Sequence, residues 1–309
     1  MLSQQAPSAV IMIRPHKFRS NPETAADNAF QASDVGNSAA LALNEFDRSV
    51  ATLREAGVTV HVFDDDGALD TPDSVFPNNW ISTHAGGHIA IFPMAAENRR
   101  RERRWDIVDF LKRAYRVQDV IDYSGLEHDD LALEGTGAMV LDHIGRVAYV
   151  ARSNRADPVL LERFCTHFNF EPMAFDAYDA GGTAVYHTNV MMAIGTDYAL
   201  IADGMITDQA RRQEVMARLA EGGRDVVSLS HYQIADFAGN AIELMGTGGQ
   251  RLLALSARAL GTLTGLQRAV IEKSARLLPL EIPTIETAGG SVRCTMAGIH
   301  LSPRPKAKA

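Results

Sequence analysis

Residues that can carry hydrolytic chemistry recur along this chain at a nearly constant spacing. The five positions are Asn79, Glu134, His187, Asn240 and Cys294, with steps of 55, 53, 53 and 54 residues. A cysteine thiolate is a strong nucleophile, and a histidine can protonate a leaving group and then activate water. A carboxylate can hold a substrate nitrogen so that the adjoining carbon lies near the sulfur. The set predicts covalent catalysis by Cys294, with His187 as acid and base and Glu134 as the orienting carboxylate.

Each of these positions opens a similar stretch of sequence. Two short apolar runs flank a glycine or aspartate turn, which is the pattern of a β-hairpin. Four hairpins are expected, at residues 79–93, 137–152, 188–202 and 240–255. The last stretch, 294–301, has no second strand after it, and the apolar run 9–14 is expected to pair with it and close a ring. A fixed period of this length indicates a repeat architecture.

Helices are expected to fill the gaps between the hairpins. The predicted ranges are 24–56, 97–115, 157–168, 207–219 and 256–277. In the second range the apolar residues Trp105, Ile107, Val108, Phe110 and Leu111 are expected to face the core. Equivalent positions of a radial array converge on its axis, so the five residues that open the stretches should meet at one end of a central channel.

The motifs at these positions resemble those of the guanidine-modifying superfamily, which includes arginine deiminases, dimethylarginine dimethylaminohydrolases and amidinotransferases. The similar segments are 73–79 (DSVFPNN), 133–137 (LEGTG), 186–189 (YHTN) and 289–294 (GGSVRC). The citrulline utilization hydrolase branch looks most similar, since it shares MIRP, FPNNW and SVRC with this chain. The resemblance covers nearly the whole chain. It implies an α/β fold, the five-bladed propeller called pentein, with pseudo-fivefold symmetry. We expect a single catalytic domain over residues 1–309, with a disordered tail at 303–309.

Two asparagines bear on the choice of substrate. Arginine deiminases and dimethylarginine hydrolases carry acidic residues near Asn78 and Asn79, where they match a cationic guanidinium. An amide can instead donate to the carbonyl oxygen of a neutral ureido group. This difference favours citrulline, hydrolysed to ornithine, ammonia and carbon dioxide. Some arginine dihydrolases of the superfamily also use asparagine, so arginine remains open.

An amino-acid substrate also needs partners for its carboxylate and its amine. By resemblance, Arg155 and either Arg99 or Arg100 are candidates for a carboxylate clamp, because an arginine fork matches that geometry. Asp73 matches an acidic position of the family and is a candidate for the amine. The charged run 99–104 is also typical of a solvated helix face. That explanation is favoured over substrate binding for most residues of the run.

Several other functions remain open from the sequence. Within the superfamily they are arginine dihydrolase or deiminase, dimethylarginine hydrolase, and amidinotransferase, which needs an acceptor amine in place of water. From another class, the chain could be a non-enzymatic pentein binding protein. A lone cysteine is more often a small buried hydrophobe than a nucleophile. For Cys294 the repeat position and the glycine-rich approach outweigh that explanation, whereas Cys165 lacks both and is expected in the core.

Composition and charge exclude some classes of partner. A net charge of −8 disfavours nucleic acid, and the lack of a long apolar run disfavours a membrane protein. Two cysteines and no signal-peptide pattern at the start indicate a cytoplasmic protein. His84 and His88 flank a glycine turn and do not share a helix face, so we expect no metal and no cofactor. The expected partner is a small amino-acid substrate, and a homodimer is left open.

Overall fold

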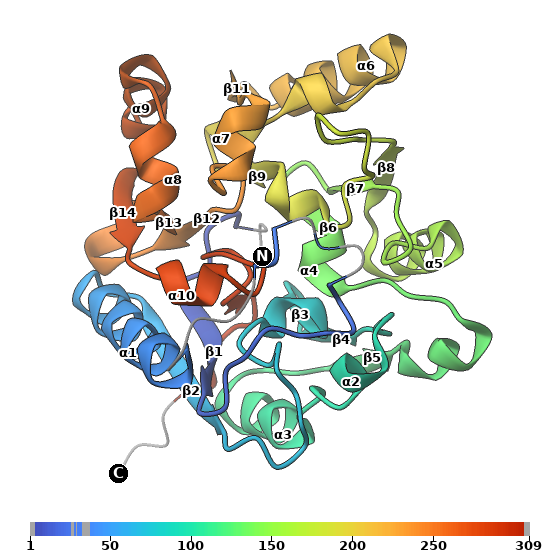
Figure 1. The fold of residues 1–309 in the computed structure, drawn as a ribbon, viewed down its shortest axis with the longest axis vertical. Helices are drawn as coiled ribbons and strands as arrows, with labels where there is room; N and C mark the ends of the chain where they lie inside the picture. The colour runs from blue at the N-terminus through green and yellow to red at the C-terminus, as the bar shows by residue number, and fades with distance from the viewer. Residues whose placement is uncertain (1–3, 26–27, 29, 33–37, 306–309) are drawn as a thin grey trace.

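The structure is a computed structural model that describes residues 4–25, 28, 30–32 and 38–305. Its described residues form five small sheets, each with three strands. In every sheet the first two strands form an antiparallel pair, and the third lies parallel to the middle strand. The α/β architecture of five repeated units around an axis is therefore confirmed (Figure 1).

The strands follow the repeat that the sequence predicts. In chain order the sheets are β3 (Ile81–His84), β4 (His88–Ile91) and β5 (Asp119–Asp122); β6 (Met139–Asp142), β7 (Val147–Ala151) and β8 (Glu171–Phe175); β9 (Met192–Ile194), β10 (Tyr198–Ile201) and β11 (Asp225–Ser228); β12 (Ile242–Met245), β13 (Arg251–Ser256) and β14 (Arg276–Leu280); and β15 (Ala297–Gly298), β1 (Ala9–Pro15) and β2 (Thr59–Asp65).

The fifth sheet joins the two ends of the chain. Strand β15 pairs antiparallel with β1, with Val10 opposite Gly298 and Ile11 opposite Ala297. The predicted closing contact between the strand after Cys294 and the N-terminal run is confirmed. Pairing the two ends completes the fifth unit and closes the ring, and such radial repetition leaves only short, protected strand edges.

A helical crossover connects the middle and third strands of each sheet and lies at the rim (Figure 1). These crossover helices are α1 (Ser38–Glu55), α3 (Trp105–Ala114), α5 (Pro158–Phe168), α6 (Gln209–Ala220), and α8 (Ala257–Thr262) with α9 (Gly265–Glu272). Shorter helices are α2 (Glu97–Arg100), α4 (Gly135–Ala138), α7 (His231–Ala235) and α10 (Pro283–Glu286). Short 3₁₀ segments lie at Pro77–Asn79, Ser124–Asp129, Thr188–Val190, Asp203–Met205 and Thr247–Gly249.

Helix α5 shows why these segments become helices. Asp157 precedes it and accepts hydrogen bonds from the backbone N–H groups of Val159 and Leu160, which are otherwise unsatisfied at a helix start. Pro158 occupies the first position, where its missing N–H costs nothing. The helix ends at Asn169, whose φ of 54° is left-handed. The predicted helix at 157–168 is confirmed to within one residue.

Three predicted helices differ from the structure. The helix predicted at 24–56 begins only at Ser38, and the described residues around Thr24 form turns. The helix predicted at 256–277 is broken at Thr264, whose side chain starts α9 with a capping box to Gln267. Its last residues belong to strand β14. The helix predicted at 97–115 is split into α2 and α3.

Two further expectations need correction. Trp105 is 53% exposed and does not face the core, because it begins α3 and lies off the stripe formed by Ile107, Val108 and Leu111. The tail was expected to be disordered from residue 303. Instead Pro303 bridges to Tyr115, and the Arg304 backbone N–H donates to the Ala114 carbonyl. Residues 306–309 lie outside the described part of the chain.

The hydrophobic core lies between the sheets and their helices. It divides into four clusters of buried side chains, so each pair of neighbouring units shares part of one cluster. The inner strands β3, β6 and β9 are buried along their whole length. Within the described residues no helix is long and apolar enough to cross a membrane.

Candidate active site

The five residues of the repeat lie just before the inner strands. Asn79 precedes β3, Glu134 caps α4 before β6, His187 precedes β9, Asn240 precedes β12, and Cys294 precedes β15. All five are buried, with at most 4% of each residue exposed. The inner strands surround the axis, so their starts lie at one end of it.

Glu134 and His187 form a direct pair in this site. The Nε2 atom of His187 lies 2.8 Å from Oε2 of Glu134. An ionised carboxylate only accepts hydrogen bonds, so Nε2 carries the proton and Nδ1 is the basic nitrogen. Burial lowers the pKa of His187, and the charges of Arg155 and Arg99 add to this, although Glu134 opposes it. At neutral pH the imidazole is therefore neutral and able to accept a proton.

The charge of Glu134 is fixed by its neighbours. Burial alone would raise its pKa, but Arg155, the hydrogen bond from His187 and Arg99 together hold the pKa far below its usual range. The guanidinium of Arg155 lies 3.5 Å from the carboxylate and that of Arg99 lies 3.6 Å from it. The other oxygen accepts a bond from the backbone N–H of Ala95 at 3.1 Å. Glu134 is thus an ionised, oriented acceptor.

Two amide side chains point at the sulfur of Cys294. The Nδ2 atoms of Asn189 and Asn240 each lie 3.2 Å from Sγ. Asn240 also donates to the Asn189 carbonyl and accepts from the backbone N–H of Arg293, which fixes its orientation. The two amides therefore hold the sulfur of Cys294 in place from two neighbouring units of the ring. Asn240 thereby gains a contact that its repeat position alone did not explain.

The glycine-rich approach to Cys294 is required by packing. Gly289 has φ of +85°, and a Cβ there would lie 2.2 Å from the side chain of Asn28. A Cβ on Gly290 would lie 2.7 Å from the ring of Phe76. The hydroxyl of Tyr186, next to His187, donates to the Gly289 carbonyl at 2.7 Å. This bond ties the histidine segment to the cysteine loop.

Asn79 and Asn78 are both buried at the same end of the axis. The amide nitrogen of Asn79 lies 3.4 Å from each ring nitrogen of His187. Among the described residues, neither polar atom of the Asn78 side chain has a hydrogen-bond partner, and the same holds for Oδ1 of Asp73. Buried polar groups are normally paired, so unpaired ones beside reactive groups fit a site that a ligand completes.

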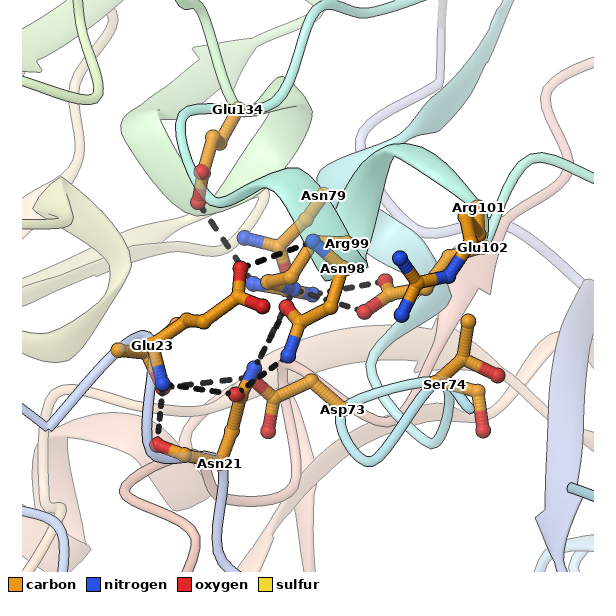
Figure 2. Close-up of polar contacts among 12 residues, drawn as sticks. Asn21, Glu23, Asp73, Ser74, Asn79, Asn98, Arg99, Arg101, Glu102 and Glu134 are labelled. Atoms are coloured by element: carbon orange, nitrogen blue, oxygen red, sulfur yellow. Dashed lines mark hydrogen bonds and ion pairs between the residues drawn. The ribbon is translucent and has the colours of Figure 1, made fainter. Parts of the chain in front are cut away.

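Arg99 lies at the centre of a buried ionic cluster (Figure 2). Its guanidinium donates to both oxygens of Glu102, at 2.9 and 3.0 Å, and lies 3.7 Å from Asp73. Burial raises the pKa of Glu102 to about 7. The charge of Arg99 opposes this rise, whereas the nearby carboxylates of Asp73 and Glu134 add to it. Arg99 is therefore already engaged by carboxylates of the protein.

The two other arginine candidates differ in position. Arg155 is buried beside Glu134, and its guanidinium lies 5.0 Å from the centre of the Tyr186 ring. Arg100 points away and donates to the carbonyls of Met94 and Ala95. No contact joins Arg100 to the other candidate side chains among the described residues, so the structure brings Arg99 and Arg155 into the site but not Arg100.

Residues outside the site behave as expected for their surroundings. Cys165 is buried in α5 among the apolar side chains of its cluster, and burial raises the pKa of its thiol to about 12, so it is a core residue. Gly86 and Gly87 turn the chain between β3 and β4 with φ of 96° and 97°, which places His84 and His88 on different strands. Within the described residues no group of three or more potential ligands is placed to hold a metal ion.

The sequence of this chain matches the model of one protein family. A model of the family described as "N,N dimethylarginine dimethylhydrolase, eukaryotic" matches residues 14–301. The chain belongs to this family. No curated protein sequence gives a significant match. The membership places the chain in the guanidine-modifying superfamily with the pentein fold, as its motifs suggested.

Solved structures of similar fold include three of particular interest. The N-terminal domain of ArgZ, an arginine dihydrolase from Cyanobacteria, aligns with a TM-score of 0.74 and 15% identity over 94% of this chain and 97% of that one. A complex of AgrE with ornithine and NAD⁺ aligns with a TM-score of 0.75 and 16% identity over 97% of this chain but 40% of that one. A dimethylarginine dimethylaminohydrolase aligns with a TM-score of 0.67 and 14% identity over 95% of this chain and 100% of that one.

Sequence reasoning missed some residues of this family member's site. Asn189 lies within the histidine motif, but its amide reaches Cys294 only because the two units are neighbours in space. Glu102 looks like one charge in a solvated run, yet it is buried against Arg99. Asn21 donates to Asp73 at 2.7 Å and bonds with Asn98, so the segment after β1 reaches the site (Figure 2). No local pattern marks these three residues.

Proposed function

We propose that this protein is a cysteine hydrolase acting on the ureido or guanidino group of an amino acid. The observation that carries this proposal is the arrangement around Cys294 and His187. Two amides donate to the sulfur of Cys294, and a neutral histidine paired with Glu134 lies at the same end of the axis. Membership of a family named for hydrolysis of a methylated arginine supports the same reaction class.

The reaction follows from the roles of these groups. The Cys294 thiol gives its proton to Nδ1 of His187, and the thiolate attacks the ureido or guanidino carbon. Glu134 accepts a hydrogen bond from a substrate nitrogen and holds that carbon near the sulfur. The C–N bond to the leaving amine then breaks, and His187 returns the proton to the amine. Water, activated by His187, attacks the covalent intermediate and releases the thiol.

Citrulline is the substrate that we propose. Hydrolysis with one water gives ornithine, carbon dioxide and ammonia, and this balance holds whichever nitrogen leaves first. The nearby carboxylates Asp73, Glu102 and Glu134 are offset by two guanidinium groups. Since the pKa of Glu102 is about 7, the cluster has little negative charge left to attract a cation. The amides of Asn78 and Asn79 can donate to a neutral ureido oxygen.

Arginine is the second candidate, because a specific comparison favours it. The ArgZ domain, which its description calls an arginine dihydrolase, shares the fold of this chain over nearly its full length. Glu134 would accept from a guanidinium as readily as from a ureido N–H. Hydrolysis of arginine with two molecules of water would also yield ornithine, with two molecules of ammonia and one of carbon dioxide.

One experiment separates these candidates. The purified protein is incubated with citrulline, arginine or dimethylarginine in separate reactions, and ornithine, citrulline and ammonia are quantified. The proposal requires ornithine from citrulline at a higher kcat/KM than from arginine. A large preference for arginine would move the assignment to an arginine dihydrolase, or to a deiminase if citrulline accumulates. Dimethylamine release would indicate a dimethylarginine hydrolase, and no product from any of the three would argue for a binding protein.

A further inference from the structure

A cavity lies on the axis of the ring, beyond the candidate active site. Its wall includes residues of the inner strands β3, β6, β9 and β12 and of β15, each further along the chain than the residue that opens its stretch. The cavity measures about 50 Å³. A buried water needs roughly 10–15 Å³ on this measure, so a few waters or one small ion fit.

Arg293 supplies positive charge to this cavity. Its side chain is partly buried and lines the wall, and its guanidinium donates to the Met296 carbonyl at 3.0 Å. No carboxylate among the described residues forms an ion pair with it. Burial lowers the pKa of Arg293 to about 10, opposed only by Cys294, so the group is charged at neutral pH. A charged group removed from water normally has a counter-ion, because leaving it unpaired costs several kcal/mol.

Glu243 is the acid that also lines the cavity, and it does not act as this counter-ion. One of its oxygens accepts from both the backbone N–H and the hydroxyl of Thr196, at 2.9 and 2.6 Å. Burial raises the pKa of Glu243, and among the charges that act on it the positive one is that of Arg251. Glu243 therefore leaves the charge of Arg293 uncompensated.

Two neutral histidines complete the polar wall. The rings of His143 and His300 stack with their centres 3.8 Å apart. Burial lowers the pKa of both, and Arg293 lowers it further, so each ring is neutral and has one N–H. The N–H of His300 is given to the backbone of Gln4, which leaves the N–H of His143 to donate. Gln5 and Thr83 also line the cavity, but their donors are engaged by the carbonyls of Leu141, Ile194 and Gly298. The free donors are thus the guanidinium of Arg293 and the imidazole of His143.

We propose that this axial cavity is a binding site for one small monovalent inorganic anion, held by Arg293 and His143, with the stacked ring of His300 positioning His143. The cavity excludes larger ions by its volume. Chloride and bicarbonate both have the required charge and size, and bicarbonate is the hydrated form of a product of the proposed reaction. The proposal does not depend on that reaction, because it rests on the cavity and on the charge of Arg293.

The test uses bromide, which can be located by its anomalous scattering. Crystals of the full-length protein are soaked in bromide, and we expect a peak within hydrogen-bond distance of the Arg293 guanidinium. Bromide titration followed by thermal shift, against gluconate at equal ionic strength, gives the affinity. Arg293→Lys should retain binding, whereas Arg293→Gln should weaken it by about tenfold or more. Bicarbonate is then added to the bromide-bound protein. It displaces bromide only if the cavity accepts bicarbonate as well as halides.

Surface bromide peaks with none in the cavity would overturn the proposal, as would equal affinity in wild type and Arg293→Gln. His143→Leu provides a second variant that keeps the charge and removes one donor, and it should also weaken binding. It keeps the test valid if Arg293→Gln does not fold. All of these measurements detect binding, so they stand whether or not citrulline is turned over.

Discussion

Asn79 faces the ring of His187, and its amide nitrogen lies 3.4 Å from both ring nitrogens. At this position an amide keeps the pocket neutral, whereas a carboxylate would add a charge next to Glu134. The preference for a ureido over a guanidinium group that we propose would therefore depend on single side chains. Replacement of one amide by an acid is the smallest change that should alter it.

We predict that Asn79→Asp lowers the ratio of kcat/KM for citrulline to that for arginine. A charge-assisted hydrogen bond is worth about 1.5–3 kcal/mol, so the ratio should change by roughly tenfold or more. The measurement is ornithine release from each substrate. Asn154→Asp, on the turn before Arg155 and outside the set of site residues, is a suitable control. An unchanged ratio in an active, folded Asn79→Asp protein would show that this amide does not select the substrate.

The helix and turns that carry these side chains explain how they approach one another. Helix α4 begins directly after Glu134 and packs against the turn that carries Asn79. A Cβ on Gly137 would lie 2.4 Å from the amide nitrogen of Asn79 and 2.9 Å from Nδ1 of His187. The glycine thus permits three units of the ring to meet at one point.

Gly137→Ala should reduce kcat strongly, because the added methyl group must displace Asn79 or His187. A misplacement of about 1 Å can cost on the order of a hundredfold in rate. The matched control is Gly125→Ala, where a Cβ would meet no atom within 4 Å. Circular dichroism should show both variants folded. Near-wild-type turnover by Gly137→Ala would mean that the two side chains are not in the working geometry.

The break between α2 and α3 places Glu102 in the ionic cluster, and this has a consequence for pH. The pKa of Glu102 is about 7 in the folded protein, above the ordinary value of 4.5. Between these values the folded state binds the extra proton, so the stabilisation from this group is full below pH 4.5 and is lost as pH rises through 7. The free energy of unfolding of wild type should fall, relative to Glu102→Gln, between pH 5 and pH 8.

Urea denaturation at several pH values measures this difference. Exposed Glu97, on the preceding helix, gives the control variant Glu97→Gln, for which the difference should stay nearly constant. If the curves of wild type and Glu102→Gln run parallel across this range, Glu102 does not titrate there.

The inner hairpins could be predicted from the sequence, and the outer strands could not. Each hairpin has apolar runs around a turn, because both of its strands are buried. An outer strand is short and partly exposed, as in Asp119–Asp122, whose two ends are acidic. Such a segment becomes a strand only because the middle strand offers free backbone groups beside it. The pattern of a single segment does not contain that information.

The candidate site was predictable for the same reason as the hairpins. One residue at a fixed repeat position per unit places Glu134, His187 and Cys294 at the starts of the inner strands, as the repeat indicated. Asn189 and Glu102 depend on contacts between units or on a helix break, so their roles follow only from the three-dimensional arrangement. Whether the arginine clamp uses Arg155 stays a prediction.

The whole molecule is held closed by the pairing of β1 with β15. Ile11 lies in that pairing opposite Ala297 and is fully buried in a cluster shared with β3 and β4. The same strand continues the fifth sheet to β2. The site depends on this closure, because Cys294 lies only a few residues before the short strand β15.

Ile11→Ala should lower the free energy of unfolding by about 2–5 kcal/mol, the usual cost of an aliphatic-to-alanine cavity. Because the seam adjoins Cys294, the variant should also lose part of its turnover below its melting temperature. Leu266→Ala is the control, since that side chain is 84% exposed. We predict from the sequence a single domain, so each protein should unfold in one transition by urea denaturation. Two separate transitions would contradict the single domain.

We propose Cys294 as the nucleophile of a ureido- or guanidino-group hydrolase. This assignment is tested most directly by measuring ornithine release from citrulline, and from arginine, by wild type, Cys294→Ser and Cys165→Ser. We predict that Cys294→Ser loses turnover by at least about a thousandfold, while Cys165→Ser, altered only in the core, stays within a few fold of wild type. Equal losses in the two folded variants, or full activity in Cys294→Ser, would contradict the assignment of Cys294 as the nucleophile.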